Sequence, residues 1–262
     1  MQAVREPHPT AQNARDFDPS WIEQHISEER RVSDLLGEIR EAVFGAQDGL
    51  ISTLAVVSTV AGATHASYPV LIAGLASALA GVFSMSAGEY MSSKSQREIF
   101  DAQIASEAEE VNERPAEAEA EVAFMLEREG LERERALRVA HEIATSKPVL
   151  LKTMVEKELG LTPGEEGGAL RGAAIMGASF GVASLVPIAP FLLIPIDLAQ
   201  YASVLFTALA LFGMGVLKSR WTRRHWLPSG AEIVVLGAFA GIAGYLIGTV
   251  LPALFGVSGA AG

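Results

Sequence analysis

The sequence predicts an all-α, polytopic membrane protein with five transmembrane helices and an acidic cytoplasmic helical insertion between spans two and three. Half of the 262 residues are hydrophobic and the mean hydropathy is +0.29, which is high for a soluble domain. A helix needs about 20 mostly apolar residues to cross a bilayer, and five stretches of the chain reach that length. They are residues 42–64, 69–92, 169–189, 194–217 and 231–254.

The N-terminal part, residues 1–41, precedes the first span and divides into two. Up to about Asp18 it is polar and lacks the apolar core and cleavage site of a signal peptide, so we expect a disordered tail. From Trp21 to Arg40 the spacing of the apolar residues predicts an amphipathic helix at the membrane surface. Its apolar members are Ile22, Ile26, Leu35, Leu36 and Ile39.

Residues 42–93 hold the first two spans, and residues 94–167 form the insertion. Residues 95–114 contain neither glycine nor proline, so we expect the second span to continue into the cytoplasm as one helix. Further helices are expected within the insertion, with breaks at Gly130 and Gly160. These helices are predicted over residues 116–129, 131–146 and 149–159.

Residues 168–262 hold the last three spans. Prolines 187, 190 and 195 predict a tight turn over residues 186–195, and the fifth span is expected to begin after residues 228–230. Glycines recur at four-residue spacing, which lets helix backbones approach closely in lipid, although a glycine-rich sequence also gives such pairs by chance. The pairs are Gly168/Gly172, Gly177/Gly181, Gly237/Gly241 and Gly244/Gly248.

Lysine and arginine in the short loops predict the orientation in the membrane. Residues 218–226, between the fourth and fifth spans, are strongly basic and are therefore placed in the cytoplasm. Residues 62–68, the turn at 186–195 and the tail after Leu251 carry no lysine or arginine and are placed outside. Five crossings then put the N-terminus and the insertion in the cytoplasm and the C-terminus outside.

Composition excludes several kinds of chemistry. The chain has no cysteine, which rules out disulfides, thiolate metal sites and a cysteine nucleophile. Any metal must bind oxygen, imidazole or thioether groups, which suit Fe²⁺ or Mn²⁺ better than Cu⁺ or structural zinc. The net charge is −11 and the acids crowd between Glu98 and Glu158, a surface that repels nucleic acid and attracts cations. In the insertion His141 precedes Glu142, and the absence of Glu-x-x-His there argues against a ferritin-type oxidase.

Four residues in or beside the first two spans are candidates for a translocation pathway. An aspartate at the centre of a membrane helix costs roughly 2.5–3.5 kcal/mol, so Asp48 is the first candidate. It could instead cap a helix break at Gly49 or bond a neighbouring helix. Met85 and Glu89 lie one turn apart in the second span and offer a soft ligand and a carboxylate. Glu41 lies at the cytoplasmic end of the first span, where the helix dipole alone also favours a carboxylate.

Six residues of the insertion form pairs that share a helix face. The pairs are Glu107 with Glu110, Glu117 with Glu121, and Met154 with Glu158. A helical bundle that turns such pairs toward one another forms an oxygen-rich metal site, whereas ordinary solvated glutamates explain the spacing equally well. A cation bound by carboxylates competes with protons for the same oxygens. A site open alternately to the two faces could therefore exchange metal for protons.

Two motifs resemble those of the vacuolar iron transporter family, which has bacterial members. They are Phe44-Gly45-Ala46-Gln47-Asp48-Gly49-Leu50-Ile51-Ser52-Thr53 and Ser84-Met85-Ser86-Ala87-Gly88-Glu89-Tyr90, the latter followed by Ser95-Gln96-Arg97. The resemblance covers residues 35–255 and includes the five spans with an acidic insertion after the second. It implies a homodimer with a path between the first spans of its two subunits, and proton-coupled export of Fe²⁺, often also Mn²⁺.

The resemblance also implies roles for individual residues. Asp48 and Met85 match the family's in-membrane carboxylate and methionine. A further set matches its metal-binding domain: Glu107, Glu110, Glu121, Met154 and Glu158. Three positions depart from the family pattern. Ser77 replaces a carboxylate of the plant members, Ala118 a glutamate of the domain, and Val155 the second of two methionines.

The sequence therefore predicts a transporter, not an enzyme, that exports Fe²⁺ or Mn²⁺ as its transported ligand and has no prosthetic group. Its expected partners are divalent metal ions, protons, the lipid bilayer and a second copy of the chain, but no nucleic acid. The Ala-, Gly- and Arg-rich composition indicates a bacterial plasma (inner) membrane. Two alternatives stay open: a membrane-anchored metal-binding or sensing protein without transport, and a transporter of zinc, cobalt or another divalent ion.

Overall fold

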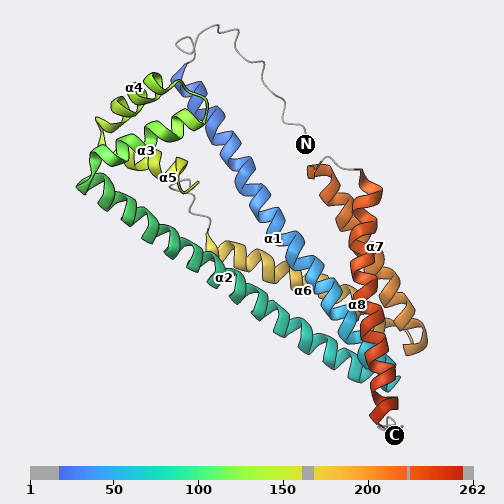
Figure 1. The fold of residues 1–262 in the computed structure, drawn as a ribbon. Helices are drawn as coiled ribbons and strands as arrows, with labels where there is room; N and C mark the ends of the chain where they lie inside the picture. The colour runs from blue at the N-terminus through green and yellow to red at the C-terminus, as the bar shows by residue number, and fades with distance from the viewer. Residues whose placement is uncertain (1–17, 161–167, 223–224, 256–262) are drawn as a thin grey trace. The chain divides into compact units, whose positions relative to one another are not determined.

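The computed structural model describes residues 18–160, 168–222 and 225–255, and every regular element in these ranges is an α-helix (Figure 1). The predicted all-α fold class is therefore confirmed. The predicted N-terminal disordered tail, apart from Asp18, lies outside the described residues. The helices are α1 (Pro19–Thr64), α2 (Ser67–Glu113), α3 (Pro115–Arg128), α4 (Arg133–Ala144), α5 (Lys147–Lys157), α6 (Ala169–Leu193), α7 (Ile196–Thr222) and α8 (Trp226–Phe255).

Five of these helices, α1, α2, α6, α7 and α8, are long and apolar enough to cross a membrane, as predicted. Their most apolar stretches have mean hydropathies between 1.4 and 2.1. Large apolar side chains on them are exposed, such as Phe83 on α2, Leu209 on α7 and Phe239 on α8. Exposed apolar surface of this extent is unfavourable in water and is the surface that lipid chains cover.

Helix α1 joins the predicted amphipathic helix and the first span without a break. It is 46 residues long, and no proline interrupts it after Pro19. Asp18 caps its start by accepting a hydrogen bond from Ser20 N at 2.9 Å, and Pro19 occupies the first turn, where no N–H is needed. The helix ends at Thr64, and the C-cap residue His65 adopts the left-handed conformation with φ 47°.

The turn predicted over residues 186–195 is shorter than expected, because α6 continues through Pro187 and Pro190 to Leu193. Proline is tolerated inside membrane helices when neighbouring helices or hydroxyl groups support the interrupted backbone. Here the hydroxyl of Ser203, on α7, donates to Pro187 O at 2.8 Å. Counting prolines therefore placed the end of the third span too early.

The start of the fifth span is also wrong in the prediction. Helix α8 begins at Trp226, before residues 228–230 rather than after them. Pro228 falls in the first turn, where a missing N–H breaks no intrahelical hydrogen bond. The hydroxyl of Ser229 donates to Gly215 O at 2.8 Å and ties this first turn to α7.

The chain divides into two compact units. The first, here called the membrane unit, comprises Met1–Ser86 and Gly172–Gly262, and the second, the acidic unit, comprises Ala87–Arg171. Helix α2 is a single helix of 47 residues, as expected, with its apolar half in the membrane unit and its polar half in the acidic unit.

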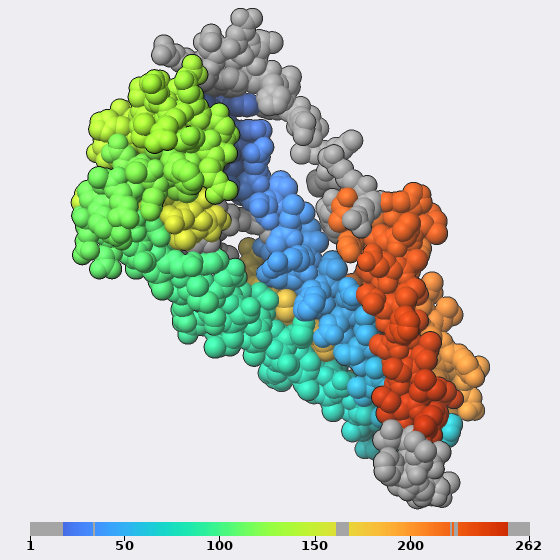
Figure 2. Space-filling view, viewed as in Figure 1, coloured from blue at the N-terminus to red at the C-terminus, as the bar shows by residue number. Residues whose placement is uncertain are grey.

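Close packing of α1 against α7 and α8 forms much of the membrane unit. Figure 2 shows the red surface of α8 directly beside the blue surface of α1. A side chain at Gly244 would collide with Ala55 O and with Thr59, so the missing Cβ lets the two backbones meet. The hydroxyl of Thr59 donates to Gly244 O at 2.8 Å. One of the predicted glycine pairs, Gly244/Gly248, thus lies in a helix–helix interface.

The acidic unit has a hydrophobic core of its own, in which α3 packs against α4 and α5. Lys157 bonds both carboxylate oxygens of Glu129, at 2.7 and 2.6 Å, and joins the end of α5 to the end of α3. The predicted breaks at Gly130 and Gly160 are confirmed, with φ values of 109° and 63°. The core residues are Val111, Ala118, Val122, Ala123, Leu126, Ala136, Ala140, Leu150 and Met154.

Candidate metal site

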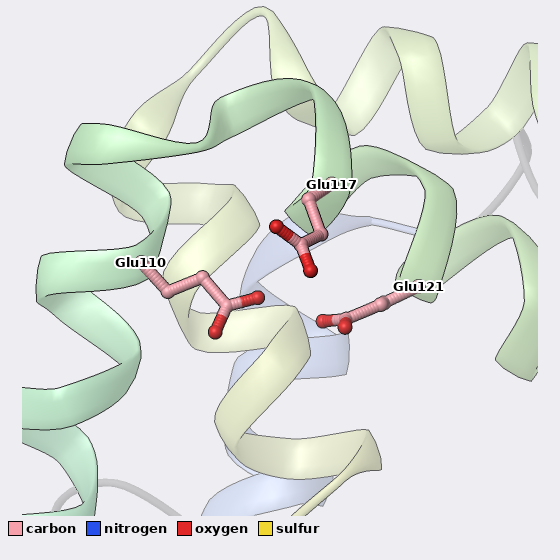
Figure 3. A group of neighbouring side chains, drawn as sticks. All are labelled: Glu110, Glu117 and Glu121. Carbon is pink, nitrogen blue, oxygen red and sulfur yellow. The ribbon is translucent and has the colours of Figure 1, made fainter.

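Three glutamates of the acidic unit bring their carboxylates together (Figure 3). Glu110 lies in the last turn of α2, Glu117 in the first turn of α3, and Glu121 one turn further on. One oxygen from each side chain lies within 4.8 Å of the other two. Oxygens that ligate one divalent cation are separated by at most about 4–5 Å, so the three groups are placed to share an ion.

The junction between α2 and α3 creates this convergence. Arg114 alone connects Glu113 to Pro115, and its backbone, with φ −131° and ψ 54°, turns the chain from one helix into the next. Arg114 N donates to Glu110 O at 2.7 Å, and Arg114 O accepts from Glu117 N at 2.9 Å. The two turns that carry the carboxylates are therefore fixed on either side of a single residue.

Burial and neighbouring negative charges raise the pKa of Glu121. Partial burial, followed by the charges of Glu110, Glu158 and Glu117, raises the pKa of Glu121 to about 7. A proton on Glu121 also allows a hydrogen bond to Glu110, which further raises this pKa. Glu121 thus changes charge near neutral pH, where a proton would compete with any cation for its carboxylate.

Glu107 and Glu158 enlarge the negative field of the cluster. Burial, then the charges of Glu158 and Glu110, raise the pKa of Glu107, which lies on α2 beyond its apolar stretch. Glu107 Oε2 and Glu110 Oε1 are buried, and no donor among the described residues bonds them. Buried carboxylate oxygens without donors are unfavourable, and a bound cation would compensate for them.

A cation of the chain itself already contacts this cluster. Arg114 Nη1 donates to Glu117 Oε2 at 2.7 Å, and Arg114 Nη2 donates to Glu110 Oε2 at 3.1 Å. The guanidinium bonds one oxygen of each of these two glutamates. The cluster therefore keeps further oxygens that Arg114 does not bond.

Met154 lies in a different environment from the converging glutamates. Its side chain is fully buried in the hydrophobic core of the acidic unit. It precedes Glu158 by one turn, and Glu158 N donates to Met154 O at 2.7 Å. Packing accounts for this position by itself, and a role for the thioether as a ligand stays a prediction.

In the membrane unit, Asp48 is half-buried on α1 between Gly45 and Gly49. A side chain at Gly45 would collide with Met176 O, and one at Gly49 with Phe180 O, so α1 and α6 touch at the level of Asp48. Helix α1 is continuous there, which makes the alternative of a helix break capped by Asp48 wrong. Sequence reasoning missed these two glycines as a contact surface, although their four-residue spacing was the available signal.

The other three pathway candidates are half-buried as well. Met85 and Glu89 lie one turn apart on α2, and Glu89 Oε1 accepts from the hydroxyl of Ser93 at 2.8 Å. A Cβ at Gly172, on α6, would lie 2.8 Å from the carboxylate oxygens of Glu41, so this glycine makes room for the carboxylate. None of the pathway candidates belongs to the three-glutamate cluster of the described residues.

The sequence matches one known protein family over most of its length. The family model of the VIT family matches residues 39–249. The chain belongs to the VIT family. It is 33% identical over 208 residues to vacuolar iron transporter 2 of Oryza sativa subsp. japonica, which covers 79% of this chain and 85% of the relative. Vacuolar iron transporter 1 of Arabidopsis thaliana is 32% identical over 217 residues, 82% of this chain and 87% of the relative.

Membership of the VIT family agrees with the fold. The relatives are named as transporters, and the five apolar helices of this VIT-family chain make it a multi-pass membrane protein. Vacuolar iron transporter 1 of Tulipa gesneriana is 29% identical over 246 residues, 94% of this chain and 96% of the relative. The family match spans every candidate residue, from Glu41 in α1 to Glu158 after α5.

Proposed function

We propose that this VIT-family protein exports Fe²⁺, and also Mn²⁺, from the cytoplasm in exchange for protons. The observation that carries the proposal is the convergence of three glutamates within 4.8 Å, one of which has a pKa of about 7, in a chain with five apolar helices. Oxygen donors without cysteine suit these two ions. The relatives named as iron transporters support the choice of iron.

The acidic unit collects the ion in this proposal. Glu110, Glu117 and Glu121 supply the converging oxygens, and Glu107 and Glu158 add negative charge that attracts a cation. Met154 is proposed as a soft ligand on the basis of the family resemblance. The supporting observations are the two buried carboxylate oxygens without a donor, since a cation would satisfy them.

The membrane unit carries the ion across the bilayer in this proposal. Asp48 would bind it inside the membrane, with Met85, Glu89 and Glu41 along the pathway. A carboxylate that holds a divalent cation is deprotonated, and reprotonation of that carboxylate weakens its hold on the cation. Alternate access of Asp48 to the two faces would then move metal outward and protons inward.

The proposed protein lies in a bacterial plasma membrane. The acidic insertion, residues 94–167, and the N-terminus are in the cytoplasm, and the C-terminus is outside. Lys218 and Arg220, near the end of α7, support this orientation, because cytoplasmic ends of membrane helices are enriched in basic residues. An odd number of spans puts the two termini on opposite sides. The proposed assembly is a homodimer with the path between the α1 helices of its subunits.

Metal uptake by sealed proteoliposomes tests the proposal. Wild-type protein should carry Fe²⁺ across the membrane under anaerobic conditions, and Asp48→Asn should abolish this flux while leaving metal binding by the acidic unit unchanged. Asp197→Asn is the matched control, because this exposed carboxylate in the first turn of α7 is a helix-dipole partner and should be dispensable.

Two outcomes would contradict the proposal. Normal transport by Asp48→Asn would mean that the in-membrane site is misplaced. Binding of the ion without flux in any sample would favour a membrane-anchored metal-binding protein.

Two further measurements refine the proposal. Competition by Zn²⁺, Co²⁺ and Mn²⁺ in the same assay would rank the transported ions. The double variant Glu107→Ala with Glu110→Ala should weaken binding by the acidic unit.

A further inference from the structure

Arg114 occupies an unusual place for a positively charged residue. It is the single residue between α2 and α3, and hydrogen bonds fix its backbone on both sides, from Arg114 N to Glu110 O and from Glu117 N to Arg114 O. Its side chain therefore starts from the point at which the two carboxylate-bearing turns meet. No motif of the sequence indicated a role for this residue.

The guanidinium bonds the same carboxylates that converge to form the candidate metal site. Its two ion pairs, to Glu117 at 2.7 Å and to Glu110 at 3.1 Å, link one residue from each helix. The side chain of Arg114 is 55% exposed, whereas that of Glu110 is 21% exposed. The arginine can therefore move into solvent while the carboxylate stays in place.

A divalent cation bound by this cluster would lie beside the guanidinium, and the two positive charges would repel each other. The guanidinium also occupies one oxygen of Glu110 and one of Glu117, so a cation that uses these oxygens has to displace it. Arginine remains protonated at every physiological pH, and the charges of Glu117 and Glu110 raise the pKa of Arg114 further. Only movement of the side chain, and not loss of its proton, can free the oxygens.

We propose that Arg114 is a built-in competing cation of the Glu110–Glu117–Glu121 cluster, which a divalent metal ion must displace before it binds. The residue thereby sets the metal concentration at which the acidic unit fills. The inference rests on the proposed function of this cluster as a metal site. It adds a threshold, so that the site stays empty at low metal concentration and fills when the ion is in excess.

The test is Mn²⁺ binding to the purified full-length protein, followed by electron paramagnetic resonance of the free ion. Arg114→Gln should bind Mn²⁺ about tenfold more tightly than wild type, since a competing charge-assisted contact is removed. Arg114→Lys keeps the positive charge and should stay within about threefold of wild type. Arg135→Gln is the matched control, because it removes an exposed charge of the acidic unit outside the cluster and should not change binding.

Unchanged or weaker binding by Arg114→Gln would overturn the inference, because an arginine that orients the carboxylates would give that result. Equal tightening by Arg135→Gln would also overturn it, since net charge alone would then be responsible. Glu110→Gln in the same series distinguishes failure of the proposed metal-collecting role from failure of the inference about Arg114. If Glu110→Gln binds like wild type, the cluster is not the metal site and the proposed collecting role fails with the inference. If Glu110→Gln loses binding and Arg114→Gln is unchanged, only the inference fails.

Discussion

At the scale of single residues, Glu121 makes the stability of the acidic unit depend on pH. Its pKa rises from 4.5 to about 7 in the folded chain, so between these values the folded state binds more protons than the unfolded state. Stability must then fall as the pH rises through this window and stay low above it. We predict that metal-free wild-type protein loses thermal stability between pH 5 and pH 8, as measured by circular dichroism.

The variant Glu121→Gln isolates this contribution. Its stability should change less between pH 5 and pH 8 than that of wild type, because glutamine has no proton to lose. Glu134→Gln is the control, since the side chain of Glu134 is 82% exposed and lies outside the cluster. Saturating Mn²⁺ should restore stability at pH 8 in wild type by binding only the folded state. Identical pH dependence in wild type and Glu121→Gln would contradict the account.

Two substitutions at Met154 distinguish a packing role of its side chain from a role as a metal ligand. Leucine has a similar volume, so Met154→Leu should keep the acidic unit folded, with a loss below about 1.5 kcal/mol. Met154→Ala should cost about 2–5 kcal/mol, because it leaves a cavity in a fully buried position. If the thioether is a ligand, Met154→Leu also weakens Fe²⁺ binding, and an unchanged affinity measured by calorimetry would assign the residue to the core alone.

At the scale of helices, α1 and α6 are in contact on either side of Asp48, at Gly45 and Gly49. Gly49→Ala puts a Cβ against Phe180 O, and over-packing of this kind costs about 1–3 kcal/mol. We predict a lower unfolding temperature in detergent and reduced metal flux. Gly213→Ala, on α7, is the matched control, because no atom beyond its own helix backbone lies within 4 Å of the added Cβ. It should be neutral or slightly stabilising, and equal damage by both variants would argue against a specific contact.

The helices themselves could be predicted from the sequence, because their apolar length and the glycine breaks are local properties. The breaks at Gly130 and Gly160 were expected for this reason and are present. The end of α6 and the start of α8 were not predicted correctly, since proline was expected to lie outside the spans. Pro187 lies inside α6 with support from Ser203, and Pro228 lies in a first turn, where proline is tolerated.

The candidate site could be predicted only in part. Spacing within one helix placed Glu117 and Glu121 on a common face, but Glu110 joins them across the junction at Arg114, which depends on the backbone angles of that residue. The burial of Met154 in the core likewise follows from packing between helices. The one-turn spacing between Met154 and Glu158 did not indicate that Met154 is buried in the core.

At the scale of the whole molecule, the proposed orientation can be tested because the chain contains no cysteine. Tyr68→Cys and Asp101→Cys introduce one thiol each, at side chains that are exposed. In intact cells, a membrane-impermeant maleimide should label Tyr68→Cys, in the predicted outside loop, but should label Asp101→Cys only after permeabilisation. The reverse labelling pattern would mean that the orientation is opposite to the proposed one. The same exchange of metal for protons would then import the metal.

The coupling of metal to protons is the central claim for the molecule as a whole. The most direct measurement follows the interior pH of sealed, anaerobic proteoliposomes while Fe²⁺ crosses the membrane, with Asp48→Asn in parallel. The account predicts that protons move opposite to the metal in wild type and that both movements are lost in the variant. Metal movement without a change of interior pH, or proton exchange that persists in Asp48→Asn, would contradict it.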